Sequence, residues 1–210
     1  MSHSQQLYHT VFNRLSEGMP RQRITRTRNV ALVVTALYLA ASCALTRVAD
    51  HLLVSGCKDS RVPRIRRLLM HPRLTVRACY QSTVMAILRH MGTARIVLIL
   101  DRTTLGNWLN ILTVSVAYRG RALPLVWKVF KKQGQFRYWH IAALLRWVKA
   151  CMPVTVEARK RWVVGDREFQ DVALQALIEH DLGWHYVQRI THNLWLSPPD
   201  KPPLKPSQVA

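Results

Sequence analysis

A short apolar run that ends in an acid constrains the fold of this chain more than any other feature. Residues 96–100 read IVLIL, a composition typical of a strand buried on both faces, and Asp101 follows at once. A second short run at 161–164 is followed by Gly165 and Asp166. Because an unpartnered buried carboxylate is costly, each acid is expected at a strand end, near water, a cation or a hydrogen-bond donor.

The segments between and after these runs predict a mixed sheet. Alternating hydrophobicity and turn signals predict three further strands and two helices, namely strands at 108–118, 122–130 and 184–190 and helices at 136–149 and 172–181. Pro124 cannot donate to a strand ladder, so the strand that contains it is expected at the sheet edge.

The order of these elements places the two acids together. Three antiparallel strands are followed by a helical crossover, and the right-handed rule sets the fourth strand parallel to the first. Asp101 and Asp166 should then lie side by side at the carboxyl edge of the sheet, where ligands of open α/β sheets bind.

Residues 1–91 contain no convincing strand and predict a helical domain. A short amphipathic helix ends near Gly18, an apolar helix covers about 30–45, a basic helix starts with Pro63 in its first turn, and another covers 75–90. We expect an α/β protein with a helical domain at 1–91, a mixed-sheet domain at 92–196 and a proline-rich tail at 197–210.

The charge of the chain indicates a polyanionic partner. Thirty-one Lys and Arg face eleven Asp and Glu, for a formal charge of +20. Nucleic acid is the first expectation, an anionic membrane the second, and a merely basic protein the remaining alternative. The apolar run at 30–45 is shorter than the roughly 20 residues that span a bilayer, so we expect a buried helix and no membrane partner.

Four cysteines are scattered without a Cys-x-x-Cys pair or zinc-like spacing. We expect them to be small buried side chains in a reducing compartment.

Two neighbouring carboxylates repel each other and need a shared proton or a cation. Their hard oxygens suit Mg²⁺ or Mn²⁺, and such ions can support phosphodiester chemistry. The alternative is that each acid only caps a turn, with Asp101 accepting a hydrogen bond from Thr103 or Thr104.

Four blocks, LILDRTTL, VSVAYRGRALPLVWKVF, WVVGDREFQ and GWHYVQRI, follow one another between residues 95 and 196. In this order they resemble the insertion-sequence DDE transposases (insertion-sequence-four-like group), and RIRRLL is similar to part of their amino-terminal region. The resemblance implies a ribonuclease-H-like catalytic core behind a helical DNA-binding domain. It implies that Asp101 and Asp166 are the first two catalytic acids, that both bind Mg²⁺ (or Mn²⁺), and that Arg167 lies near DNA.

The same resemblance implies metal-dependent strand cleavage and strand transfer at insertion-sequence ends. The implied partners are double-stranded DNA, both the terminal repeats and the target, and a second copy of the chain on that DNA. The implied location is the bacterial cytoplasm, at the nucleoid.

The chain departs from the family at the third acid, a glutamate on a later helix. No glutamate follows Glu179, and Glu168 is expected instead to begin the helix after the fourth strand. We therefore expect the front part of a transposase, truncated before the third acid. The alternative is a catalytically inactive truncated DNA-binding protein that occupies element ends and regulates transposition.

Further candidates surround these acids in the sequence. Basic residues expected to contact DNA are Arg64, Arg66, Arg67, Lys131, Lys132, Arg137 and Arg167; a solvated helix face is the alternative for the first three. Thr103 and Asn107 are candidates for orienting Asp101. Trp127 and Trp139 are expected in the core, with base stacking as the alternative, and His140 on a helix surface.

Overall fold

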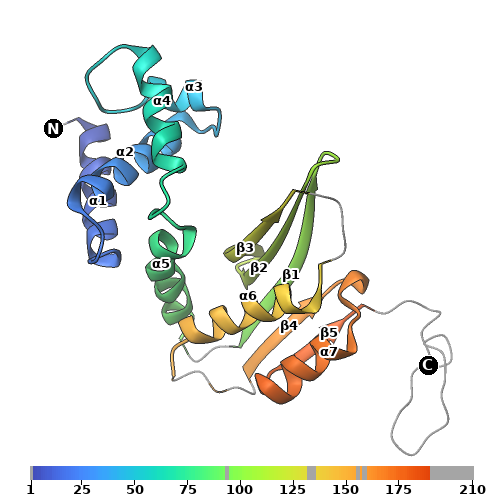
Figure 1. Cartoon of the computed structure of the whole chain (residues 1–210). Coiled ribbons are helices and arrows are strands. Elements are labelled where there is room, and N and C mark those ends of the chain that lie inside the picture. Colours follow the sequence, from blue (N-terminus) through green and yellow to red (C-terminus); the bar gives the residue numbers. More distant parts are fainter. Residues whose placement is uncertain (1, 93–94, 132–135, 155–156, 158–159, 190–210) are drawn as a thin grey trace, which may run out of the picture. The chain divides into compact units, whose positions relative to one another are not determined.

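The computed structural model describes residues 2–92, 95–131, 136–154, 157 and 160–189. The chain divides into two compact units, Met1–Val84 and Met85–Ala210, and the division falls within a helix (Figure 1). The first unit is helical and the second is built on a sheet. The architecture is therefore α/β with its purely helical part first, in agreement with the sequence-based expectation.

The helical unit contains α1 (His3–Gly18), α2 (Ile24–Ala40), α3 (Leu45–Asp50), α4 (Lys58–Leu69) and the first part of α5 (Val76–His90). Its core joins α2, α3 and α4 through the buried residues Val33, Ala36, Val48, Ala49, Leu52 and Ile65. The apolar run of the sequence is thus a packed helix of this unit. No helix in the described part of the chain is long and apolar enough to cross a membrane.

One expectation for the helical unit was wrong, and one short helix was not anticipated. α4 begins at Lys58, so Pro63 lies inside the helix and not in its first turn. The earlier start is stabilised by Asp59 in the first turn, and the Ser60 hydroxyl donates to the Cys57 carbonyl oxygen. The short helix α3 was not anticipated, because six residues give too little periodicity to recognise.

The second unit holds a five-stranded mixed sheet of β1 (Ile96–Leu105), β2 (Leu109–Tyr118), β3 (Arg121–Phe130), β4 (Arg161–Gly165) and β5 (His185–Gln188). The strand order is β3-β2-β1-β4-β5. β2 is antiparallel to β1 and β3, whereas β4 is parallel to β1 and β5. The predicted mixture of antiparallel and parallel strands is confirmed.

β3 forms an edge of the sheet, as Pro124 predicts. The register shifts there, because Val114 pairs with Val126 while Ser115 pairs with Pro124. Leu125 is therefore the extra residue of a bulge, and both Leu125 and Val126 are buried. The bulge lets a strand that contains proline keep its apolar side chains in the core.

Residues of even number on β1 line the buried face of the sheet: Ile96, Leu98 and Leu100 are at most 3% exposed. α6 (Tyr138–Cys151) packs on β2, β3 and α7 (Val172–Ala176), and it buries Ile141, Leu144, Leu145 and Val148. α7 continues into a π-helical turn, η3 (Leu177–Asp181), so the predicted helix at 172–181 is present in two parts.

β1 is longer than the sequence indicates. The apolar signal stops at Leu100, but β1 continues to Leu105, because residues 101–105 pair with residues 109–113 of β2. Asp101 therefore lies within a strand and not at its tip. The pairing with β4, in contrast, ends at Leu100 opposite Gly165.

Candidate functional site

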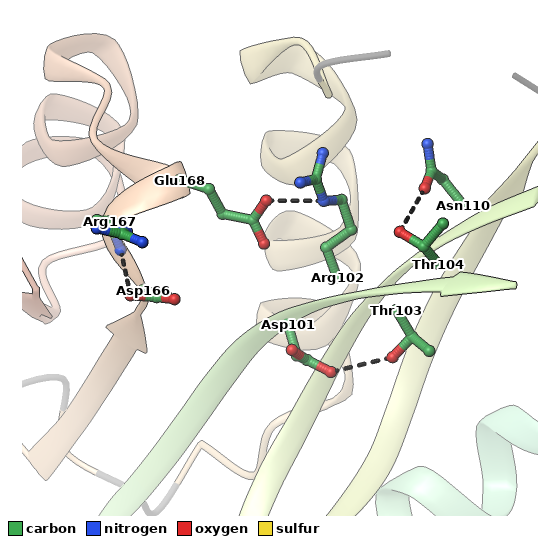
Figure 2. Close-up of polar contacts among 8 residues, drawn as sticks. All are labelled: Asp101, Arg102, Thr103, Thr104, Asn110, Asp166, Arg167 and Glu168. Atoms are coloured by element: carbon green, nitrogen blue, oxygen red, sulfur yellow. Dashed lines mark hydrogen bonds and ion pairs between the residues drawn. The ribbon is translucent and has the colours of Figure 1, made fainter. Parts of the chain in front are cut away.

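The two acids singled out by the sequence occupy matching positions on neighbouring parallel strands. The last pair of the β1–β4 ladder is Leu100 with Gly165, and Asp101 and Asp166 are the next residue on each strand (Figure 2). Both acids are exposed. The two acids thus lie at the end of the parallel β1–β4 pairing, each directly after the last paired residue of its strand.

Each of these carboxylates accepts one local hydrogen bond. Thr103 Oγ1 donates to Asp101 Oδ2 over 3.2 Å, and the Arg167 backbone N–H donates to Asp166 Oδ1 over 2.7 Å. Thr104 instead donates to Asn110 Oδ1. The expected contact of Asp101 with Thr103 is therefore present, although it lies along β1 and caps no turn, whereas Asp166 caps the turn after β4; one oxygen of each carboxylate is occupied. Carboxylate oxygens have further lone pairs that can bind a cation.

Arg102 and Glu168 lie on the other side of β1 from the Asp101 carboxylate (Figure 2). Arg102 Nε and Glu168 Oε2 are 2.7 Å apart, with about a third of each side chain exposed. Glu168 belongs to a 3₁₀ turn, η2 (Arg167–Phe169), which Asp166 caps, so the predicted helix start here is a short turn.

Burial raises the pKa of the Glu168 carboxyl, and the negative charges of Asp166 and Asp101 raise it further, although Arg102 opposes the shift. The effect of both aspartates on this pKa means that the ion pair and the two acids share one electrostatic environment.

A pocket of about 350 Å³ adjoins this ion pair. Its lining is both charged and apolar and consists of Arg102, Phe136, Ile141, Arg167, Glu168, Phe169, Gln170 and Asp171. Arg167, expected near DNA, is thus exposed beside Asp166 and faces this pocket. The pocket joins the turn after β4 to the segment that leads into α6.

Aromatic residues continue from the pocket. The Phe130 ring lies 4.7 Å from the Phe136 ring and 4.7 Å from the His140 ring, measured between centroids. Desolvation by burial lowers the pKa of His140, and the positive charges of Lys128 and Arg137 lower it further. His140 is accordingly half-buried and not a free surface histidine.

The tryptophans differ from the expectation of a core role. Trp139 is 53% exposed, because it lies on the outer side of α6 whereas Ile141 and Leu145 point inward. Trp127 is half-buried on β3. Only the Trp139 prediction is plainly wrong, since it rested on the general tendency of tryptophan to be buried and not on the position of Trp139 on the helix.

The remaining sequence candidates fall at separate places. Lys131 is exposed directly after β3, Arg137 precedes α6, and Lys132 lies outside the described residues. Asn107 is exposed in the turn between β1 and β2. Since a strand rises about 3.3 Å per residue, the extended segment from Asp101 to Leu105 carries Asn107 away from the acids.

The arginines of α4 belong to a different pocket, within the helical unit. This pocket measures about 500 Å³, and its lining includes Arg23, Arg26, Arg64, Arg67 and His71. Arg64 donates to Asn29 Oδ1 over 2.8 Å, and Arg66 is exposed on the same helix outside the pocket lining. The arginines predicted on α4 are therefore at the surface, and two of them, Arg64 and Arg67, line a pocket.

The cysteines were predicted incorrectly as a group. Cys43 and Cys57 are exposed, Cys79 is half-buried and only Cys151 is buried. Cys57 precedes α4 and Cys43 follows α2, and helix-flanking positions such as these give a cysteine no apolar surroundings.

The described residues hold no group of three or more His, Cys, Asp or Glu side chains arranged to bind a metal ion. The candidate donor set is therefore the pair Asp101 and Asp166. Two exposed carboxylates fit Mg²⁺, which is commonly held by one or two carboxylates together with water and substrate phosphates.

Sequence reasoning missed Arg102 as the ion-pair partner of Glu168, and it missed Phe136 as a residue that lines the pocket. Strand alternation does place Arg102 on the opposite face from Asp101, but its pairing with a residue 66 positions later carries no local signal.

No protein-family model matches the chain, and no curated protein is significantly similar to it.

Proposed function

We propose that this chain is a DNA-processing protein of the DDE transposase kind, with a ribonuclease-H-like core that contributes Asp101 and Asp166 to metal-dependent strand cleavage and transfer. The observation that carries the proposal is the adjacency of these two exposed acids on parallel neighbouring strands. The parallel pairing of β1 with β4 supports the proposal, and the net charge of +20 suits a polyanionic substrate.

Asp101 and Asp166 would hold a divalent cation such as Mg²⁺ or Mn²⁺. Such an ion, when bound, lowers the pKa of a water molecule and stabilises charge on a phosphodiester. Thr103 holds the Asp101 carboxylate, and the Arg167 backbone amide holds that of Asp166. These contacts fix the two acids before substrate arrives, and preorganised acids favour catalysis.

The cations of this unit would position the DNA. Arg102 and Arg167 line the pocket beside Glu168 and can bind phosphate oxygens. Cleavage and transfer at two element ends would require a second copy of the chain on the same DNA.

A second function is supported by a different observation. The described residues offer two acids and not three, whereas the pocket of the helical unit is lined by four arginines and a histidine without an acid. This arrangement suits a protein that binds element ends and regulates transposition without cutting. Both functions share DNA as partner and differ in the chemistry of the carboxyl edge.

Nicking of supercoiled plasmid separates the two. The purified chain is incubated with plasmid and Mg²⁺ or Mn²⁺ and compared with Asp101→Asn and Asp166→Asn. The transposase proposal predicts open-circular product that falls at least about a hundredfold in either variant, as expected when a group acting in the transition state is removed. Binding to the plasmid without nicking, with affinity that falls steeply with salt, would favour the regulator.

A further inference from the structure

The aromatic residues near the pocket lie toward the same end of the sheet as the two acids. β3 runs parallel to β1, because each is antiparallel to β2, and its last residue, Phe130, pairs with Asn110 in the row of Thr104, three residues beyond Asp101. The segment before α6 returns to this end and places Phe136 against the Phe130 ring. The aromatic residues are therefore toward the same end of the sheet as the two acids, on the face that carries Arg102.

Two cations lie over aromatic rings in this group. The Arg137 guanidinium lies 4.9 Å from the Trp139 ring, and the Lys128 ammonium lies 5.3 Å from the Phe130 ring. Trp139 is 53% exposed although burial of so large an apolar side chain is favourable. A surface that combines exposed rings with held cations offers stacking and phosphate neutralisation together.

The surface is continuous with the pocket beside Glu168. Phe136 belongs to both, since it contacts Phe130 and lines the pocket with Arg102 and Arg167. Across the sheet, Arg102 pairs with Leu112 and Leu112 pairs with Lys128, so Arg102 and Lys128 occupy one row on the same face. Cations thus extend from the turn that holds Asp166 to the aromatic rings.

We propose that the surface formed by Lys128, Phe130, Phe136, Arg137 and Trp139 binds unpaired nucleotides of a DNA strand. The proposal rests on the proposed function, since DNA must be the partner of the chain. In a duplex the base faces are already stacked on one another, whereas an unpaired base can stack on an exposed indole. The bases would stack on Trp139 while the phosphates follow the cations toward the turn that holds Asp166.

Stacking and charge make different contributions to such binding, and each can be removed alone. Stacking on one aromatic residue changes affinity by roughly 5- to 150-fold and does not release counterions. A phosphate contact on single strands contributes about 0.7 to the slope of log affinity against log salt concentration. Removal of the indole should therefore weaken binding without changing this slope, whereas removal of the guanidinium should reduce it.

The test is fluorescence anisotropy of labelled 20-nucleotide oligothymidine and a labelled 20-base-pair duplex, without divalent cations, at several salt concentrations. We expect Trp139→Ala to weaken oligothymidine binding by about tenfold with an unchanged salt slope. Trp139→Phe should recover most of the affinity, Arg137→Gln should lower the slope, and duplex binding should change less than twofold in Trp139→Ala.

Trp108→Ala is the matched control, since Trp108 is 69% exposed and lies in the turn between β1 and β2, outside the proposed surface. The proposal is overturned if Trp139→Ala binds oligothymidine like the parent, or if Trp108→Ala loses as much. It is also overturned if the Trp139 variant changes self-association in sedimentation while DNA binding is intact, because the surface is then a protein contact. Failure of the folded parent to bind either DNA would defeat the proposed function itself. Circular dichroism melting confirms that each variant is folded.

Discussion

The two units of the molecule carry the same net charge in different arrangements. The helical unit, residues 1–84, has thirteen Lys and Arg against three acids, and residues 85–210 have eighteen against eight, which gives +10 in each. The pocket of the helical unit has cations and no acid in its lining. The pocket of the sheet unit brings Arg102 and Arg167 together with Glu168 and Asp171.

Net charge alone therefore does not distinguish a surface that only holds a polyanion from one that can also act on it. A lining of arginines attracts phosphates and releases counterions, but it provides no ligand for a metal ion. In the sheet unit, Asp101 and Asp166 are each followed by an arginine, so cations can attract the substrate while these acids, which lie outside the pocket lining, accept a divalent ion. The difference between the units lies in where the acids were placed.

The largest expected effect is on the free energy of unfolding, and it tests whether the two units unfold independently. Leu98 is fully buried in β1, so Leu98→Ala should lower the free energy of unfolding of the sheet unit by about 3 kcal/mol through lost burial and a residual cavity. Hydrogen exchange should show faster exchange in β1 and β4 and unchanged protection in α2. Equal losses in α2 would mean that the two units unfold together, and Ile65→Ala provides the reciprocal variant in the helical core.

The next effect concerns the cation-only pocket. The double variant Arg64→Gln/Arg67→Gln should weaken duplex binding by at least about tenfold and reduce the salt slope by about 2, since each phosphate contact contributes about 1. Arg14→Gln/Arg47→Gln removes the same charge from exposed positions of the helical unit outside the pocket. If both double variants change the slope equally, the pocket has no special part in binding DNA.

A smaller effect on stability is expected at Gly165, which directly precedes Asp166. A Cβ atom at Gly165 would lie 3.1 Å from Tyr186 Oη and 3.2 Å from Phe169 Cβ, so its neighbours must move. Gly165→Ala should cost about 1–2 kcal/mol of stability, as expected for mild overpacking. A double-mutant cycle with Tyr186→Phe should show coupling, because the Tyr186 hydroxyl is the nearest obstacle. Additive effects would contradict this packing.

The smallest expected effect is a pH dependence of the free energy of unfolding that arises from Glu168. The pKa of Glu168 is higher in the folded chain, so the folded state binds more protons in the window between the ordinary and the raised pKa. The free energy of unfolding contributed by this group therefore falls as pH rises through that window. Glu168→Gln removes this fall, so Tm of the variant minus Tm of the parent should increase with pH there. A difference that decreases would show that the ion pair with Arg102 outweighs burial.

Much of the sheet could be predicted because its signals are local or topological. Hydrophobic alternation and turns located the strands, and the handedness of the crossover set β4 beside β1. Pro124 alone identified the edge strand. The extension of β1 to Leu105 was not predicted, because the polar residues of this segment have no apolar pattern. They belong to the strand through their pairing with β2.

The rest of the site depends on contacts between distant residues. The ion pair between Arg102 and Glu168 forms only after β1 and the turn that follows β4 come together. The exposure of Trp139 follows from its place on the side of α6 opposite Ile141 and Leu145, and the general tendency of tryptophan to be buried does not show this. Contacts and exposure of this kind depend on how distant elements pack together, and a single sequence carries no direct signal of that packing.

The most direct test of the central claim is a Mn²⁺ titration monitored by electron paramagnetic resonance. We predict that the parent chain binds Mn²⁺ and that Asp101→Asn/Asp166→Asn loses this binding. Glu17→Gln/Asp59→Asn makes the same change in charge within the helical unit and should bind like the parent. Equal binding by parent and both double variants would contradict the claim that these two acids form the metal site of a DNA-cutting centre.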